Sequence, residues 1–257
     1  MRIYNPYIDK LAGDHTKLLV FDCEFWRVYG NKGYIPIPNT NEFFMPREFG
    51  GFILKKHKDE GWDYNGHFFV TLSPPKDLDV SFVSSEFATV TDKTADILDS
   101  YQSILQLPWA SAYLNTLPEE QHGLLLDNIR VYLNDPIIHE AHKPPSWYKT
   151  FLKHYSDSLI IVKGVSDIEA IQNACKFYGI PYTPPKAVYD IAKWNAESRR
   201  KCGTAKLEGT YTCVIRDTDT RGSKKKDLTD ILPLGRAHDP SADAAMTLLV
   251  ALYIVSR

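Results

Sequence analysis

A short apolar run that ends in two carboxylates constrains the fold of this chain most strongly. Leu18–Phe21 contains four consecutive apolar residues, which is typical of a buried strand. The strand is expected to begin at Lys17, to continue through Asp22 and Glu24, and to end near Trp26. Because acidic residues are almost never fully buried without a partner, a strand that carries two of them out of an apolar core requires a cation or water at that point.

The order of the other predicted elements defines the fold class. Strands at Glu48–Lys55 and Gly66–Leu72 follow the first one and predict an antiparallel meander over the first 75 residues. Later in the chain, short strands at Leu159–Val162 and near Val188 alternate with helices. The predicted helices are Thr94–Leu107, Glu119–Leu133, Ser146–His154, Asp167–Tyr178 and a last one from near Pro240. This order predicts an α/β fold with a mixed sheet, antiparallel in its first three strands and then parallel, flanked by helices.

The length of 257 residues favours one enlarged domain with two insertions. A helical insertion is expected at about 94–155, and a basic loop insertion at about 199–229, where apolar periodicity is weak. Between Lys193 and Lys226 there are ten basic and four acidic residues. The net charge of −2 excludes a polycationic nucleic-acid coat, so any polyanion must be met locally. The basic stretch is therefore either a solvated loop or a guide for a phosphate backbone.

Composition also indicates the cellular compartment. The four cysteines, at positions 23, 175, 202 and 213, are too sparse for a disulfide framework and favour a reduced chain. Met1–Lys10 has no apolar core of the kind found in signal peptides. The apolar run Ala244–Val255 is shorter than the roughly 18 residues that span a bilayer. The expectation is an intracellular protein, cytoplasmic or nuclear, that is neither secreted nor embedded in a membrane.

Two carboxylates lie on one face of the first strand. Side chains two residues apart on a strand point the same way, so Asp22 and Glu24 lie side by side while Cys23 faces the opposite side. Such a pair either binds a cation or belongs to an edge strand whose acids face water. The apolar run before the pair favours the cation.

Three further residues extend this acidic set. Asp167 lies at the start of a helix that follows a strand, where it either caps the helix or reaches a ligand at the carboxyl end of the sheet. Asp239 is a natural N-cap with Pro240 after it, which leaves His238 in the preceding loop and places Asp243 on the second helical turn.

The chemistry of this set favours hard divalent cations. Mg²⁺ and Mn²⁺ bind carboxylate, water and phosphate oxygens, whereas zinc prefers Cys and His. Two such ions about 4 Å apart stabilise the attacking and leaving oxygens of an in-line phosphoryl displacement. A histidine with an ordinary pKa near 6.5 is able to take a proton from the attacking water. The inventory therefore fits phosphodiester hydrolysis.

The order and spacing of these motifs resemble the DEDDh group of 3′-to-5′ exonucleases, within the DnaQ-like exonuclease superfamily. The matching segments are Phe21–Phe25, Lys163–Asp167 and His238–Ala244, supported by Glu48–Gly51 and Phe69–Pro74. The resemblance spans residues from about 18 to 251. It implies an RNase H-like fold, a single-stranded nucleic-acid 3′ end as the partner, and release of nucleoside 5′-monophosphates, with RNA slightly preferred.

The same resemblance implies roles for individual residues. Asp22 would bridge two divalent ions, Mg²⁺ or Mn²⁺, Glu24 and Asp243 would hold the ion that activates water, Asp167 would serve the second ion, and His238 would be the general base. A proofreading-type DNA exonuclease is the alternative enzyme. The alternative from another class is a catalytically idle RNase H-like module that binds nucleic acid or protein.

One departure from the family pattern concerns the substrate. Bulky residues follow Glu24 where the family often has small ones next to the terminal nucleotide. The candidate substrate-binding residues are Cys23, Phe25, Trp26, Arg27, Arg199, Arg200 and Lys201.

Overall fold

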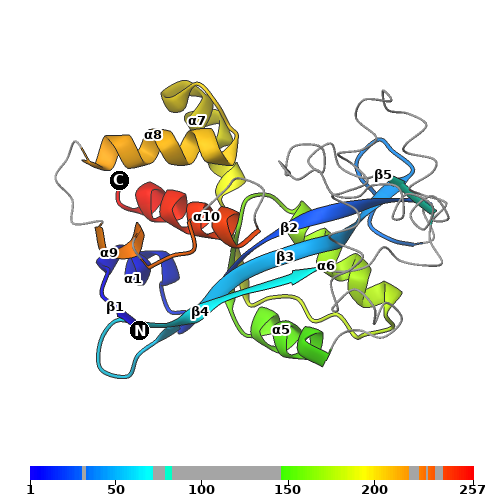
Figure 1. Cartoon of the computed structure of the whole chain (residues 1–257), viewed down its shortest axis with the longest axis horizontal. Coiled ribbons are helices and arrows are strands. Elements are labelled where there is room, and N and C mark those ends of the chain that lie inside the picture. The colour runs from blue at the N-terminus through cyan, green and yellow to red at the C-terminus, as the bar shows by residue number, and fades with distance from the viewer. Residues whose placement is uncertain (31–32, 72–78, 83–145, 220–225, 230, 235–239) are drawn as a thin grey trace, which may run out of the picture.

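A computed structural model describes residues 1–30, 33–71, 79–82, 146–219, 226–229, 231–234 and 240–257 (Figure 1). The predicted helices Thr94–Leu107 and Glu119–Leu133 lie outside these residues. The helical insertion at about 94–155 is therefore described only in its last part, and the rest stays a prediction.

A mixed sheet forms the centre of the fold (Figure 1). Its order is β1-β4-β3-β2-β6-β7, with β5 also paired to β2. Strand β2 is antiparallel to β3 and parallel to β6, which is in turn parallel to β7. The strands are β1 Arg2–Ile3, β2 Lys17–Tyr29, β3 Glu42–Lys56, β4 Trp62–Thr71, β5 Asp79–Phe82, β6 Leu159–Val162 and β7 Ala187–Asp190. This confirms the predicted α/β class with antiparallel and then parallel strands, an arrangement compatible with an RNase H-like fold.

The meander is longer than predicted. Strand β3 begins at Glu42 rather than Glu48, and the β2–β3 pair extends as far as Tyr29 opposite Glu42. The pair has a register shift after Glu24, where Arg47 is the extra residue on β3. A bulge of this kind changes which side chains face each side of the sheet. The alternation in the first half of β3 is therefore out of phase with that in the second half, and the sequence pattern predicted only the second half as a strand.

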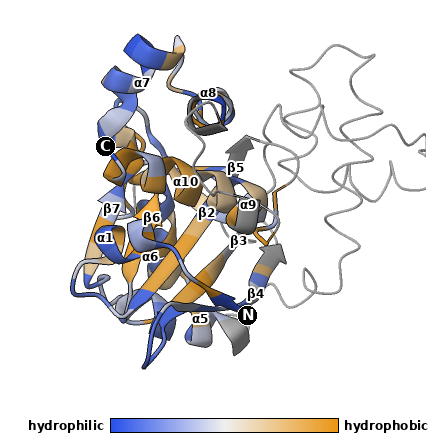
Figure 2. Ribbon diagram, turned by 90° about the vertical axis from the view of Figure 1, so that its left-hand side faces the viewer, coloured by the Kyte–Doolittle hydropathy of each residue, from blue (hydrophilic) through white to orange (hydrophobic). Residues whose placement is uncertain are grey.

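Helices cover both faces of the sheet, as Figures 1 and 2 show. Helix α10 packs on β2 and β3 together with α1 and α8 on one side, while α5 and α6 contribute to the core on the other. The helices are α1 Pro6–Ala12, α5 Ser146–Ser156, α6 Ser166–Phe177, the 3₁₀ helix η3 Ile191–Trp194, α7 Asn195–Cys202, α8 Leu207–Asp219, α9 Lys226–Thr229 and α10 Pro240–Val255. No helix among the described residues is long and apolar enough to cross a membrane.

The alternation of β2 separates two cores. Leu19 and Phe21 pack with Phe151 and other α5 and α6 residues, whereas Leu18 and Val20 face the core that contains α10. All of these side chains are buried. Both faces of the sheet are therefore covered along Leu18–Phe21, and Asp22 continues the face covered by α10.

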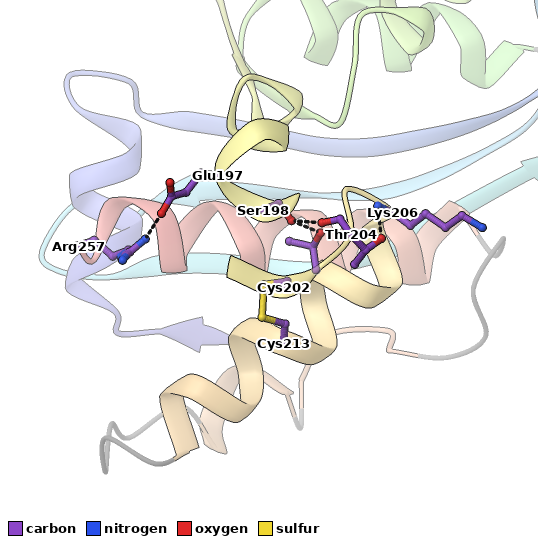
Figure 3. Close-up of a disulfide and its surroundings, with 8 residues drawn as sticks. Glu197, Ser198, Cys202, Thr204, Lys206, Cys213 and Arg257 are labelled. Atoms are coloured by element: carbon purple, nitrogen blue, oxygen red, sulfur yellow. Dashed lines mark hydrogen bonds and ion pairs between the residues drawn. A yellow bond between two sulfur atoms is a disulfide. The ribbon is translucent and has the colours of Figure 1, made fainter. Parts of the chain in front are cut away.

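The prediction of a basic loop at about 199–229 is wrong for the described residues of this segment. The segment contains α7, α8 and α9, and a disulfide joins Cys202 on α7 to Cys213 on α8 (Figure 3). The expectation of four reduced cysteines is wrong for this pair, whereas Cys23 and Cys175 are free and buried. Sequence spacing missed the disulfide because a tight turn between two helices brings together residues that are 11 positions apart.

Two glycines on β3 allow close approaches, Gly50 to the start of α10 and Gly51 to the neighbouring strand β2. A Cβ atom at Gly50 would lie 2.5 Å from Ser241 Oγ and 2.8 Å from Ser241 N. A Cβ atom at Gly51 would lie 2.1 Å from Val20 O. The hydroxyl of Ser241 donates to Phe68 O at 3.0 Å, which fixes the first turn of α10 over β4 as well.

We expect Gly50→Ala to push the start of α10 away from the sheet. Overpacking of this kind costs about 1–3 kcal/mol, so the melting temperature should fall. Because α10 carries Asp243, Mn²⁺ binding measured by titration calorimetry should weaken as well. The control is Gly13→Ala, which meets no atom within 4 Å but has a φ of +56°. It should lower stability and leave Mn²⁺ affinity unchanged; equal weakening in both variants would contradict the role of the close approach.

Candidate metal and catalytic site

The first two carboxylates lie side by side on β2, as predicted. Asp22 is level with Gly50 on β3, and Glu24 is level with Glu48. Because Gly50 has no side chain, Ser241 at the start of α10 occupies the space above it. Glu24 is buried, while Asp22 keeps a partly exposed surface.

Helix α10 brings the third carboxylate to this pair. It begins at Pro240, as the sequence predicts, but Asp243 lies in its first turn rather than in the predicted second turn. Ligand oxygens of Asp22, Glu24 and Asp243 all lie within 4.8 Å of one another. Two elements that are more than 200 positions apart in the chain thus form a set of three oxygen ligands.

Asp167 approaches the same place from α6. It is 4% exposed. Its Oδ1 accepts a hydrogen bond from Cys23 N at 2.9 Å, which ties the start of α6 to the segment between Asp22 and Glu24. Asp167 is outside the set of three that share one possible ion, but its charge acts on Asp22.

The electrostatics of the cluster favour a bound cation. Burial raises the pKa of Asp22 well above its usual range, and the charges of Asp167, Asp243 and Glu24 raise it further. Burial is also the main cause that raises the pKa of Asp167 to about 7, although hydrogen bonds from the Cys23 and Asp167 amides oppose it. Like charges held together this closely are stabilised by a divalent ion or by protons.

A buried arginine that the sequence did not reveal lies beside Glu24. Arg47 is the extra residue of the β3 bulge and is 2% exposed. One guanidinium nitrogen lies 3.8 Å from Glu24 Oε2 and 3.8 Å from Glu48 Oε2. Arg47 therefore lies where it can position Glu24, and it balances part of the charge of the two glutamates. The buried position of Arg47 follows from the bulge. The bulge depends on how β2 pairs with β3, so the sequence alone did not reveal it.

Lys163 and Asp190 were also missed by sequence analysis. Lys163 follows β6 and lies close enough to feel the charges of Asp22, Asp243 and Asp190. Asp190 ends β7, and its Oδ1 accepts hydrogen bonds from Gly164 N and Ala192 N, both at 2.8 Å. These bonds fix the turn between β6 and α6. The sequence signal that could have indicated both residues is that each is polar and lies at the end of one of two neighbouring parallel strands.

His238, the predicted general base, lies outside the described residues. It precedes Pro240, the first residue of α10, by two positions. Its proposed role stays a prediction.

The candidate substrate-binding residues on either side of Glu24 are divided between the core and the surface. Cys23 is 4% exposed and Trp26 is 2% exposed, and both lie in the core with α5 and α6. This corrects the expectation for both side chains, because neither is accessible to a substrate. Phe25 is half-buried with its ring 4.5 Å from that of Phe44, and Arg27 lies near Glu42 at 3.7 Å.

The predicted basic residues on α7 lie at the far end of α10 from Asp243. Lys201 Nζ is 5.1 Å from the ring of Tyr253, which is about 15 Å along the helix from Asp243 at a rise of 1.5 Å per residue. Arg200 pairs with Glu197, which also contacts Arg257 at 3.4 Å. Arg199 is exposed on the same helix. The expectation that these three residues guide a phosphate to the carboxylates is therefore not supported.

Comparison of the sequence with protein-family models and with curated protein sequences finds no match.

The arrangement suits oxygen-preferring divalent ions. Its ligands are three carboxylates from β2 and α10, and no described Cys or His belongs to the set. Mg²⁺ and Mn²⁺ prefer such ligands and keep water or phosphate in their remaining positions. One ion therefore fits Asp22, Glu24 and Asp243.

We expect the metal-free protein to lose stability as the pH rises through the titration of Asp167. Its pKa in the folded state is about 7, above the ordinary 3.8, so the native state holds a proton that the unfolded chain has already lost. Stability from this group is complete at low pH and decreases between about pH 4 and pH 7.

Asp167→Asn removes this ionisation and keeps an oxygen that accepts from Cys23 N. The melting temperature of the metal-free variant should exceed that of the wild type by more at pH 8 than at pH 5. Differential scanning calorimetry in EDTA measures the difference. A difference that is independent of pH would contradict the assignment.

Proposed function

We propose that this protein is a metal-dependent 3′-to-5′ exonuclease that hydrolyses single-stranded nucleic acid, with RNA slightly preferred, and releases nucleoside 5′-monophosphates. The observation that carries the proposal is the convergence of Asp22, Glu24 and Asp243 within 4.8 Å on a mixed sheet of the predicted type. The motif order that resembles DEDDh exonucleases supports it independently of the geometry.

The proposal assigns binding to carboxylates from three elements. Asp22, Glu24 and Asp243 would hold one divalent ion, Mg²⁺ or Mn²⁺. The second ion implied by the resemblance would use Asp22 and Asp167, whose Oδ1 also accepts from Cys23 N. Divalent ions at this place would supply Lewis acidity and lower the pKa of a bound water.

Other residues of the chain would position these groups and transfer the proton. Arg47 fixes Glu24 within the bulge, and Asp190 fixes the turn that precedes Asp167. The imidazole of His238 would take the proton from the attacking water, because a histidine changes charge near neutral pH.

The function is tested with 5′-labelled single-stranded RNA and DNA, each with a free or a blocked 3′ end, in Mg²⁺, Mn²⁺ or EDTA. We expect stepwise shortening from free 3′ ends, with no activity in EDTA. Asp22→Asn and Asp243→Asn should each reduce the rate about a hundredfold or more, because each removes an ion ligand at the reacting centre. Asp157→Asn is the matched control, since Asp157 pairs with Lys17 and Lys186 away from the cluster.

Four results would distinguish the alternatives. Activity in EDTA, or full activity of Asp22→Asn, contradicts the proposal. Equal cleavage of circular substrates identifies an endonuclease. Binding of the oligonucleotides without cleavage in any metal identifies the idle RNase H-like module, and a clear preference for DNA favours the proofreading type.

A further inference from the structure

Lys163 lies beside Asp22 because of the parallel pairing of β2 with β6. Val20 is level with Ile161 in this pair. Asp22 and Lys163 both follow this paired segment by two residues, Asp22 within β2 and Lys163 directly after β6. The charges of Asp22 and Asp243 act on the ammonium group of Lys163, so this group lies near the carboxylate cluster.

The ammonium group of Lys163 is held by a backbone carbonyl rather than by an acid. Its Nζ donates a hydrogen bond to Ala205 O at 2.5 Å. Within the described part of the chain it forms no ion pair, although Asp22, Asp243 and Asp190 are near enough to raise its pKa against the larger effect of burial. An ammonium group has three N–H donors, so two remain available at the carboxylate cluster.

Ala205 belongs to a rigid turn. It lies between α7 and α8, which are joined by the Cys202–Cys213 disulfide (Figure 3). The hydroxyl of Ser198 donates to Thr204 O at 2.7 Å and lies 2.6 Å from Thr210 Oγ1. The turn therefore offers a fixed carbonyl, and Lys163 is held at a constant distance from the acids.

We propose that Lys163 binds a non-bridging oxygen of the substrate's phosphate, an inference that rests on the proposed exonuclease function. A lysine that served only to neutralise the cluster would contact one of its carboxylates. Lys163 instead is partly buried and donates to the carbonyl of Ala205, while the charges of Asp22 and Asp243 act on it. A phosphate oxygen would suit this position, because it accepts from an ammonium group and would also ligate a divalent ion held by the carboxylates.

The experiment measures binding of adenosine 5′-monophosphate to the full chain by titration calorimetry in Ca²⁺, with adenosine as the probe that lacks the phosphate. Mn²⁺ alone is titrated separately. The variants are Lys163→Met, Lys163→Arg and, as the control, Lys186→Met, whose lysine pairs with the exposed Asp157. Thermal unfolding checks the fold of each variant, and Lys163→Gln replaces Lys163→Met if the latter does not fold.

We expect Lys163→Met to weaken binding of the monophosphate about tenfold or more, as for loss of a hydrogen bond between charged groups. Lys163→Arg should lose less, and Lys186→Met should match the wild type. Adenosine binding should be the same in all variants. Mn²⁺ affinity without nucleotide should be unchanged or higher in Lys163→Met, since a nearby positive charge is removed.

Two failures can be told apart. If the wild type degrades RNA and binds the monophosphate, but Lys163→Met binds it equally well, the phosphate role of Lys163 is wrong and the exonuclease proposal stands. If Lys163→Met binds Mn²⁺ more tightly and the monophosphate equally well, Lys163 serves only to balance the charge of the carboxylates, and the inference is overturned. If the wild type neither binds the monophosphate nor cleaves any substrate, the proposed function fails and the role of Lys163 fails with it.

Discussion

The close approach of α10 to β3 is the contact on which the candidate site depends. Without a side chain at Gly50, the backbone of Ser241 packs directly on the sheet, and Asp243 comes within reach of Asp22 and Glu24. The rest of α10 is buried almost throughout, so its long apolar surface holds this end in place. The free energy of an ordinary hydrophobic core thus opposes the repulsion of three carboxylates that would otherwise separate.

The charge distribution shows how the cluster is sustained before any ion binds. Arg47 lies between Glu24 and Glu48, and Lys163 lies beyond Asp22, so each end of the group has one cation. Two cations do not balance the acids that surround them, and burial together with the charges of neighbouring acids raises the pKa of Asp22 and of Asp167. A structure that needed only stability would exchange such buried acids for apolar residues, and retaining them favours a role in binding cations.

Sequence patterns predicted what depends on neighbours in the chain. The apolar runs located β2 and β6, and the Asp-Pro pair located the start of α10, so Asp22, Glu24 and Asp243 were found without the structure. Features that depend on pairing were missed. Arg47 owes its burial to a bulge, Trp26 enters the core because the alternation changes phase after Glu24, and Cys202 meets Cys213 through a turn between two helices that polar composition concealed.

The placement of α7 changes the explanation of how a neutral protein would meet a polyanion. Lys201 lies against the ring of Tyr253 near the end of α10 and Arg200 pairs with Glu197, so the charges of these two residues are used in local packing and an ion pair. In the proposed function, attraction at the carboxylates would then come from bound divalent ions and from Lys163, which donates to Ala205 O in the α7–α8 turn. Among the described residues, the segment that composition marked as a phosphate guide would contribute through this backbone carbonyl.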